Sequence, residues 1–261
     1  MRAILFDMDG VLYDADRPIA GAAETVAWAK HRSIPYLFVT NTTSRDRVAL
    51  VDKLHTFGIV ASEQEIMTPA VALVQWLRQQ GCGGPLALFL PPSVKHEFAG
   101  MPCLSDDEEK SAVLYVVIGD LQDRWDYRTL NRAFRLLYFN PEAKLIAMGM
   151  TRYWLASDGI SLDVAPFVAA LERATGRQPI VFGKPMKSFF VGAAEQLGMA
   201  PGDVLMVGDD IETDVGGAQS GGVKGAIVKT GKFRPADLEG PIRPYVVLDS
   251  IADLPVWWNE H

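Results

Sequence analysis

The feature that most constrains the fold is an alternation of short apolar runs with longer segments in which apolar residues recur at helical spacing. Strand–helix alternation of this kind predicts a parallel β-sheet covered by helices on both faces. Strands are expected at 3–6, 35–40, 86–90, 112–118, 144–148 and 203–210, with a further strand before Gly183 in "IVFGKP" (180–185) and a strand and turn at 224–231. Helices are expected at 22–32, 44–58, 68–81, 126–139, 165–176, 187–198 and 213–222.

Two glycine-containing stretches divide this pattern. The segments "GCGGP" at 81–85 and "GRQP" at 176–179 are typical of linkers, and the character of the chain changes between them. The simplest organisation is an α/β core formed by residues 1–80 and 180–261, with a second α/β domain inserted at 81–179. An acidic run, "SDDEEK" at 105–110, is expected to form a solvated loop within the insertion.

Polar residues follow four of the expected core strands. The groups are Asp7 and Asp9, Thr40 and Asn41, Gly183 with Lys184, and Asp209 with Asp214. In open α/β sheets, reactive groups gather at the carboxyl ends of the strands, so we expect these side chains to converge at one edge of one sheet.

Each group also has an ordinary structural interpretation. Asp7 and Asp9 could mark a strand that runs into an Asx-type turn, Lys184 could be a surface lysine, and Asp214 could cap the following helix. The joint pattern favours chemistry. Several Asp oxygens suit a hard cation such as Mg²⁺, and a cation with a lysine can hold a phosphate group and stabilise the charge of phosphoryl transfer.

Composition narrows the class of protein. The 261 residues carry a net charge of −7, which argues against a nucleic-acid surface. The two cysteines, Cys82 and Cys103, are too few for a disulfide framework and predict a reduced, cytoplasmic chain. No secretory signal is evident, and the longest apolar run, at 112–118, is too short to span a bilayer, so no membrane partner is expected.

The order of these motifs resembles the phosphatases of the haloacid dehalogenase superfamily. "DMDGVLY", "VTNTTS", "GKP" and "GDDIETD" match its four motifs in sequence order. Thr40 and Lys184 are far enough apart to hold the inserted domain, as in subclass IIA, where a large α/β cap lies between the second and third motifs. The resemblance therefore implies a Rossmann-like, three-layer core with an inserted α/β cap domain.

The resemblance also implies roles for individual residues. Asp7 would be the nucleophile and form an aspartyl-phosphate, while Asp9 would act as the general acid and base. Mg²⁺ would be bound by the side chains of Asp7 and Asp209 and by the backbone carbonyl of Asp9, with Asp210 as a weaker alternative to Asp209. The remaining roles are phosphate contacts from Thr40, Asn41 and Lys184, support from Asp214, and a sharp turn at Gly10.

The match extends into the insertion, because residues 158–190 resemble a branch of subclass IIA that contains phospholysine phosphohistidine inorganic pyrophosphate phosphatases. Relatives place substrate-facing residues in the segment matching 148–159. Arg152 could meet a second anionic group there, and Tyr153 and Trp154 either line the leaving-group site or pack within the cap. A homodimer through the cap is expected from the resemblance alone.

The resulting hypothesis is a Mg²⁺-dependent phosphatase that acts on a small phosphorylated compound. Two alternatives stay open: activity specifically on phosphohistidine, phospholysine or inorganic pyrophosphate, and a non-catalytic phosphate-binding module. A phosphomutase is disfavoured because no helical cap separates the first two motifs. A dehalogenase is disfavoured because its first motif lacks the second acid, which Asp9 supplies here.

Overall fold

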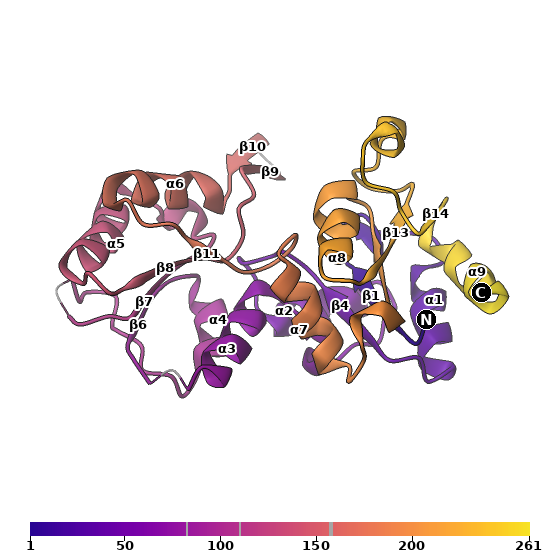
Figure 1. Ribbon diagram of the computed structural model, residues 1–261, viewed down its shortest axis with the longest axis horizontal. Helices are drawn as coiled ribbons and strands as arrows, with labels where there is room; N and C mark the ends of the chain where they lie inside the picture. The colour runs from indigo at the N-terminus through magenta and orange to yellow at the C-terminus, as the bar shows by residue number, and fades with distance from the viewer. Residues whose placement is uncertain (82, 110, 157–158) are drawn as a thin grey trace. The chain divides into compact units, whose positions relative to one another are not determined.

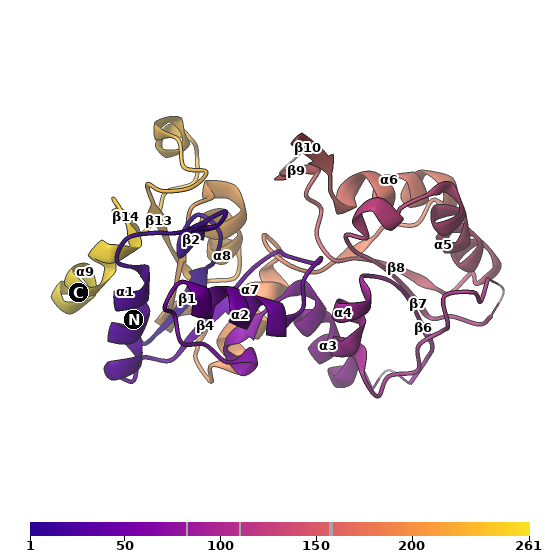
Figure 2. The same cartoon turned by 180° about the vertical axis from the view of Figure 1, so that it is seen from behind.

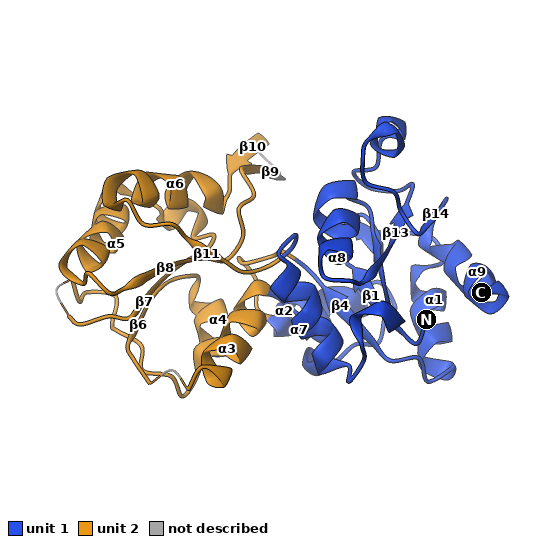
Figure 3. Cartoon of the chain, in the orientation of Figure 1, with its two compact units in different colours: residues 1–40, 47–68, 184–261 blue, residues 41–46, 69–183 orange. Residues whose placement is uncertain are grey.

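A computed structural model describes residues 1–81, 83–109, 111–156 and 159–261 of the chain (Figures 1 and 2). Cys82 and the side chain of Trp154 therefore lie outside the described part, as do the predictions made for them. The chain forms two compact units, which Figure 3 colours separately. Unit 1 contains residues 1–40, 47–68 and 184–261, and unit 2 contains residues 41–46 and 69–183. Unit 2 thus begins earlier than the predicted insertion, and the assignment of each unit as a separate domain stays a prediction.

Unit 1 is built on a six-stranded sheet in which every neighbouring pair is parallel. Its order is β14 (Val246–Leu248), β13 (Lys224–Val228), β12 (Val204–Gly208), β1 (Ala3–Asp7), β4 (Tyr36–Val39) and β5 (Ile66–Met67). All five residues of β1 and of β12 are buried, as is typical of the central strands of a sheet covered on both faces.

Helices cover this sheet as the alternation predicts. One face carries an apolar core that includes Phe6, Phe38 and Val207 together with buried residues of α1 (Ala22–His31) and α2 (Arg47–Thr56). The C-terminal helix α9 (Leu254–Glu260) joins this core through Leu254. A π-helical turn, Ile211–Gly216, leads into α8 (Gly217–Ser220) and contacts β12 and β13. Helix α7 (Lys187–Gln196) and a short hairpin of β2 (Tyr13–Asp14) and β3 (Arg17–Pro18) complete the α-helices and strands described in unit 1.

Unit 2 has a four-stranded parallel sheet in the order β11 (Ile180–Val181), β8 (Lys144–Ala147), β7 (Tyr115–Ile118) and β6 (Leu86–Phe89). Side chains alternate along β7: Val116 and Ile118 enter one core with α5 (Tyr127–Phe139) and α6 (Val164–Thr175), whereas Val117 enters another with α3 (Pro69–Gln79). Helix α4 (Pro92–Lys95) and an antiparallel pair, β9 (Tyr153–Ala156) and β10 (Gly159–Leu162), are the remaining α-helix and strands described in unit 2. The predicted α/β class with parallel sheets is confirmed.

The strand at Ile180–Val181 differs from the sequence-based expectation. We expected it to return the chain to the sheet of unit 1, but it pairs in parallel with β8, with Ile180 opposite Ile146 and Val181 opposite Ala147. Strand β11 is therefore an edge strand of the sheet of unit 2, and the chain enters unit 1 only at Lys184. An apolar run predicts a strand, but it carries no information about which of two parallel sheets the strand joins.

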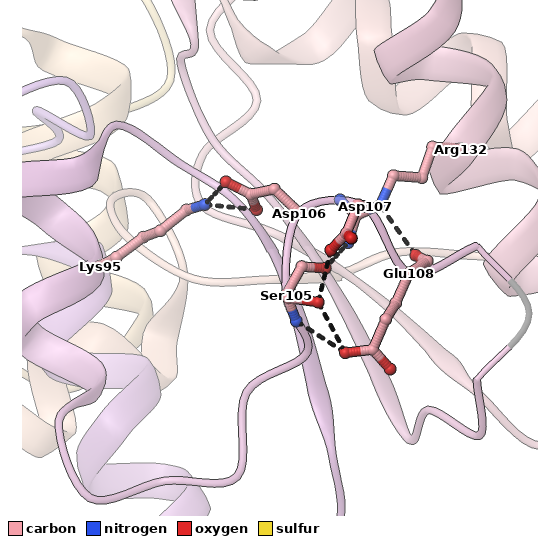
Figure 4. Close-up of polar contacts among 6 residues, drawn as sticks. All are labelled: Lys95, Ser105, Asp106, Asp107, Glu108 and Arg132. Atoms are coloured by element: carbon pink, nitrogen blue, oxygen red, sulfur yellow. Dashed lines mark hydrogen bonds and ion pairs between the residues drawn. The ribbon is translucent and has the colours of Figure 1, made fainter.

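The acidic run at 105–110 is an exposed loop through most of its described part, as expected, but it is also anchored (Figure 4). Arg132 of α5 is buried and donates from Nε to the Glu108 carbonyl at 3.0 Å and from Nη2 to the Ser105 carbonyl at 2.8 Å. Lys95 pairs with Asp106 at 2.6 Å. The loop's negative charge is thus partly offset by buried Arg132 and by two partly exposed cations, Lys95 and Arg135.

Candidate functional site

Three neighbouring strands of unit 1 end in polar residues at the same edge of the sheet. In the register of the sheet, Asp7 lies opposite Val39 and Phe6 lies opposite Val207. Asp7 therefore ends β1, while Thr40 and Asp209 follow the ends of β4 and β12 on either side of it. Asp7, Thr40 and Asp209 are all more than nine-tenths buried.

Lys184 is the positive centre of this edge. Its Nζ lies 2.6 Å from Oδ1 of Asp7 and 2.7 Å from Oδ1 of Asp214, and the lysine is only 5 % exposed. Asp214 comes from the π-helical turn after β12 and is fully buried. Asp7, Lys184 and Asp214 therefore lie together as sequence analysis expected, although Lys184 follows a strand of the other sheet.

The carboxylates are strongly affected by burial. Burial raises the pKa of Asp209 to about 6 and that of Asp214 to about 7, with the neighbouring acids adding to the rise for both. Burial also raises the pKa of Asp7, although Lys184 opposes that rise. One lysine among three buried acids leaves negative charge that is costly to keep away from water.

A divalent cation would relieve this cost, and the acids are placed to hold one. Asp7, Asp209 and Asp214 each offer an oxygen, and these atoms all lie within 4.8 Å of one another. Asp209 Oδ1 is buried and has no hydrogen-bond partner among the described residues. The donor set of carboxylate oxygens fits a hard cation.

The three acids differ in how their oxygens are used. Asp214 accepts the Lys184 ion pair on Oδ1 and the backbone N–H of Asp210 on Oδ2, at 3.1 Å. Asp7 uses Oδ1 for both Lys184 and the backbone N–H of Met8, at 2.8 Å, and no contact to Oδ2 is seen among the described residues. Asp7 and Asp209 are therefore better placed to bind a cation than Asp214, whose oxygens are both engaged.

Asp210 has a different task. Its Oδ1 accepts the backbone N–H groups of Glu212 and Thr213 at 3.0 and 2.9 Å, which caps the π-helical turn that carries Asp214. Helix N-termini leave such N–H groups without partners inside the helix, so an Asp before the turn is favoured there. This engagement of Asp210 supports Asp209 as the cation ligand of the pair.

The turn after β1 brings Asp9 and Gly10 to the same region. Gly10 has φ +81°, and a Cβ at this position would lie 2.0 Å from Oδ2 of Asp209. A side chain is therefore excluded both by the backbone conformation and by the close approach of Asp209. Asp9 follows directly after Met8 and has an exposed side chain.

Sequence analysis missed the segment after β13. Thr230 donates from Oγ1 to the carbonyl of Gly10 at 2.6 Å, and the backbone N–H of Lys232 donates to Oδ2 of Asp209 at 2.7 Å. Burial would lower the pKa of Lys232, but Asp209, Asp7 and Asp210 outweigh it and leave that pKa raised. The sequence "KTGK" carries no signal by itself, because its position depends on the packing of β13 beside the strand that leads to Asp209.

Other predicted site residues belong to unit 2. Asn41 packs against Gly183, where a Cβ would lie 2.8 Å from Oδ1 of Asn41. Arg152 is exposed, and its guanidinium lies 5.9 Å from the centre of the Tyr153 ring, which is also exposed. Their contacts with substrate stay predictions, as does the phosphate contact of Thr40.

The geometry places buried acids around one lysine, and comparison with known proteins gives the class. Residues 4–101 match the family model of haloacid dehalogenase-like hydrolases, and residues 181–254 match a second model described as HAD-hydrolase-like. The chain belongs to the haloacid dehalogenase-like hydrolase family, as its four motifs predicted, and it is a phosphohydrolase of that family.

Individual relatives sharpen this placement. The human phospholysine phosphohistidine inorganic pyrophosphate phosphatase is 37 % identical over 97 % of this chain and 92 % of its own length. Haloacid dehalogenase-like hydrolase domain-containing protein 2 from Bos taurus is 38 % identical over 94 % of this chain and 90 % of its own. The predicted resemblance to the first of these two groups is confirmed.

Solved structures agree with the fold. A hypothetical protein from Pyrococcus horikoshii superposes with a TM-score of 0.91 at 29 % identity, covering 99 % of this chain and 100 % of that one. The p-nitrophenyl phosphatase from Archaeoglobus fulgidus gives a TM-score of 0.87 at 26 % identity and covers 97 % of each chain. In the described part of the chain, we find no helix with the length and apolar character needed to cross a membrane.

Proposed function

We propose that the chain is a Mg²⁺-dependent phosphatase that hydrolyses a small phosphorylated compound through an aspartyl-phosphate on Asp7. The observation that carries the proposal is the buried arrangement in which Lys184 lies between Asp7 and Asp214, at 2.6 and 2.7 Å. The names of the curated and solved relatives support phosphatase chemistry.

The cation would be held by Asp7 and Asp209, with the Asp9 carbonyl as a further ligand. When bound, Mg²⁺ supplies positive charge that offsets the buried acids and the charge of the transferring phosphoryl group. Lys184 supplies a second positive charge beside Asp7, and Asp214 holds that lysine in place. Thr40 would donate a hydrogen bond to a phosphoryl oxygen, and Asn41 would do so from its backbone.

Two chemical steps follow from these positions. In the first, Asp7 Oδ2 attacks phosphorus, the bond to the leaving group breaks, and the Asp9 carboxyl gives its proton to the leaving atom. In the second, Asp9 takes a proton from water, whose oxygen attacks phosphorus and releases phosphate and the free Asp7 carboxylate. The exposed side chain of Asp9 is consistent with a group that exchanges protons, whereas buried Asp7 keeps one oxygen engaged by Lys184.

The narrower candidate is activity on phosphohistidine, phospholysine or inorganic pyrophosphate. It is favoured by the recurrence of this name among relatives at 36–37 % identity. A phosphoramidate leaves as an amine and pyrophosphate leaves as phosphate, so each would need different contacts around the leaving group. We propose that Arg152 would contact a second anionic group of the substrate.

The test is phosphate release from a panel of p-nitrophenyl phosphate, pyrophosphate, phospholysine and phosphohistidine compounds, nucleotides and sugar phosphates. Each substrate is assayed with Mg²⁺ and with EDTA, on the wild type, on Asp7→Asn and on Asp16→Asn. Asp16 is a matched control because its side chain is 99 % exposed in the same unit.

We expect turnover that EDTA and Asp7→Asn abolish and that Asp16→Asn leaves unchanged. The rank order of substrates then decides between the general and the narrower proposal. Turnover that persists in Asp7→Asn would contradict the aspartyl-phosphate route, and turnover that persists in EDTA would contradict the dependence on Mg²⁺.

A further inference from the structure

The segment Thr230–Lys232, which we call the β13 loop, makes two hydrogen bonds to the edge that carries the acids. Thr230 Oγ1 donates to the carbonyl of Gly10 at 2.6 Å, and the backbone N–H of Lys232 donates to Oδ2 of Asp209 at 2.7 Å. The loop therefore contacts both the turn that follows Asp9 and the side chain of Asp209.

Glycine at position 231 allows the loop to come this close. A Cβ on Gly231 would lie 2.1 Å from Asp209 Oδ2 and 2.6 Å from the Cα of Gly10, and the residue has φ +60°. Gly10 approaches the same oxygen from its own side, with a Cβ position 2.0 Å away. Asp209 Oδ2 is thus confined between two glycines, and no larger residue fits at either position without displacing the carboxylate.

The two oxygens of Asp209 are consequently not equivalent. Oδ2 is held by the β13 loop, whereas Oδ1 is buried with no hydrogen-bond partner in the described part of the chain. A buried carboxylate oxygen without a partner is costly, and a cation ligand role would remove that cost. A group that hydrogen-bonds the second oxygen of a metal-binding carboxylate fixes the orientation of that carboxylate and contributes to metal affinity.

We propose that the β13 loop is a positioning element for the metal site, and that it presents Oδ1 of Asp209 to a divalent cation. The Lys232 N–H fixes the carboxylate, Gly231 allows the close approach, and the Thr230 hydroxyl holds the Gly10 carbonyl and thereby the turn that carries Asp9. The inference rests on the metal dependence proposed above, and it adds three residues outside the four motifs.

The test is calorimetric titration of the protein with Mg²⁺, without substrate, so that the readout is binding rather than turnover. Thr230→Val removes the hydroxyl and keeps the shape, and Gly231→Ala places a methyl group against Asp209. Thr25→Val is the matched control for the first, because Thr25 Oγ1 also bonds a backbone carbonyl, that of Ile251 at 3.2 Å. Gly198→Ala is the control for the second, because Gly198 has φ +67° but nothing within 4 Å of its Cβ position.

Loss of a group that orients a metal ligand typically weakens metal affinity about 10- to 100-fold. We expect Thr230→Val to weaken Mg²⁺ affinity about 10-fold and Gly231→Ala to weaken it about 100-fold. Thr230→Ser restores the hydroxyl and should restore wild-type affinity, which a purely structural role for the Thr230 methyl group would not produce. Thermal unfolding without Mg²⁺ should show Thr230→Val destabilised about as much as Thr25→Val. Gly231→Ala should be destabilised more than Gly198→Ala, because only at Gly231 does the added methyl group meet other atoms.

The outcomes separate the two proposals. If the wild type binds Mg²⁺ and both loop variants bind it as their controls do, the positioning role is wrong while the metal dependence stands. If the wild type binds no Mg²⁺, both are wrong. If Gly231→Ala does not fold, Thr230→Val and Thr230→Ser alone decide the matter.

Discussion

The two units contain the same kind of sheet, but their carboxyl edges differ in chemistry. In unit 1, β1, β4 and β12 are followed or ended by Asp7, Thr40 and Asp209. In unit 2, β6, β8 and β11 are followed by Leu90, Met148 and Phe182, and only β7 leads to an acid, Asp120 after Gly119. Parallel strands create an edge where side chains meet in both units, and the residue that follows each strand decides whether that edge can do chemistry.

The buried acids show the same difference. In unit 1, Asp7 and Asp214 share a buried lysine. In unit 2, buried Asp120 accepts the backbone N–H of Gln122 at 2.9 Å, and the described residues contain no ion pair to it. Burial raises the pKa of Asp120, as it does for Asp7. A raised pKa alone therefore does not distinguish a reactive acid from a structural one. What separates Asp7 from Asp120 is the buried lysine that Asp7 shares with Asp214.

The largest expected effect contrasts Asp7→Asn with Asp120→Asn. Both changes replace a buried acid after a parallel strand with its neutral isostere. Removal of a nucleophile should lower turnover on the order of 10⁴-fold or more. Asp120→Asn should change kcat less than about tenfold, because the amide oxygen of Asn can still accept the Gln122 N–H. The measurement is steady-state phosphate release with Mg²⁺.

The contrast would break if Asp120→Asn removed turnover as thoroughly as Asp7→Asn. That result would assign chemistry to the edge of unit 2 as well. Circular dichroism and unfolding of both variants provide the control for folding.

The next largest effect concerns Lys184, which has no counterpart among the described residues at the carboxyl edge of the unit 2 sheet. Lys184→Met removes the positive charge between two buried acids. It should lower turnover about 10³-fold, because the lysine would stabilise the charge that develops on the phosphoryl group. It should also destabilise the protein by about 3 kcal/mol, because a buried ion pair loses one partner. Phosphate release and urea unfolding measure the two effects.

Lys229→Met is the matched control. Lys229 pairs with Asp249 at the same 2.7 Å that separates Lys184 from Asp214, but its side chain is 45 % exposed. An exposed pair contributes about 0.2–1 kcal/mol, so Lys229→Met should change both stability and turnover little. Equal losses in the two variants would show that burial is not what gives Lys184 its importance.

Sequence reasoning predicted most of the fold because, over long segments, the hydrophobic periodicity and the residues that start or end helices indicate the same element. The helix expected at 126–139 begins after Asp126, whose carboxylate accepts the Thr129 N–H at 2.7 Å, and the helix expected at 165–176 ends at Gly176 with φ +70°. Short strands were harder, because two or three residues carry no period. The strand at 66–67 was not expected, and the strand at 180–181 was assigned to the wrong sheet.

Sequence analysis predicted the part of the candidate site whose polar side chains belong to the four motifs. Asp7, Lys184, Asp209 and Asp214 meet as expected. The β13 loop was missed because its contribution lies in a backbone N–H, a glycine and one hydroxyl, and such groups acquire meaning only through the packing of distant segments. Thr230 and Gly10 are 220 residues apart in the chain.

A smaller effect compares two arginines of α5 in unit 2. Arg132 is buried and bonds two carbonyls of the acidic loop, whereas Arg135 is half exposed and pairs with Glu109 at 2.5 Å. Arg132→Met should destabilise the protein by about 2–3 kcal/mol, because hydrogen bonds from a charged group are lost inside the protein. Arg135→Met should cost about 0.5 kcal/mol. Urea unfolding measures both, and equal values would show that the loop needs no buried anchor.

The smallest effect is a pH dependence in unit 2. Burial, with a contribution from Asp120, raises the pKa of Asp163 to about 6 from an ordinary value of 3.8. The folded chain thus keeps this proton to a higher pH than the unfolded chain does. The stability that Asp163 contributes should be fully present below about pH 4 and fall as pH rises toward 6.

Asp163→Asn removes that titration and keeps an oxygen for the Val164 N–H, which Asp163 Oδ1 accepts at 2.8 Å. The free energy of unfolding of wild type minus that of Asp163→Asn should therefore decrease between pH 4 and 7. The decrease should be about 1 kcal/mol rather than the full shift, because solvent screens a partly exposed carboxyl. Urea unfolding at pH 4.5, 5.5 and 6.5 measures the trend, and an increase with pH would show that the carboxylate is stabilised by its cap rather than penalised by burial.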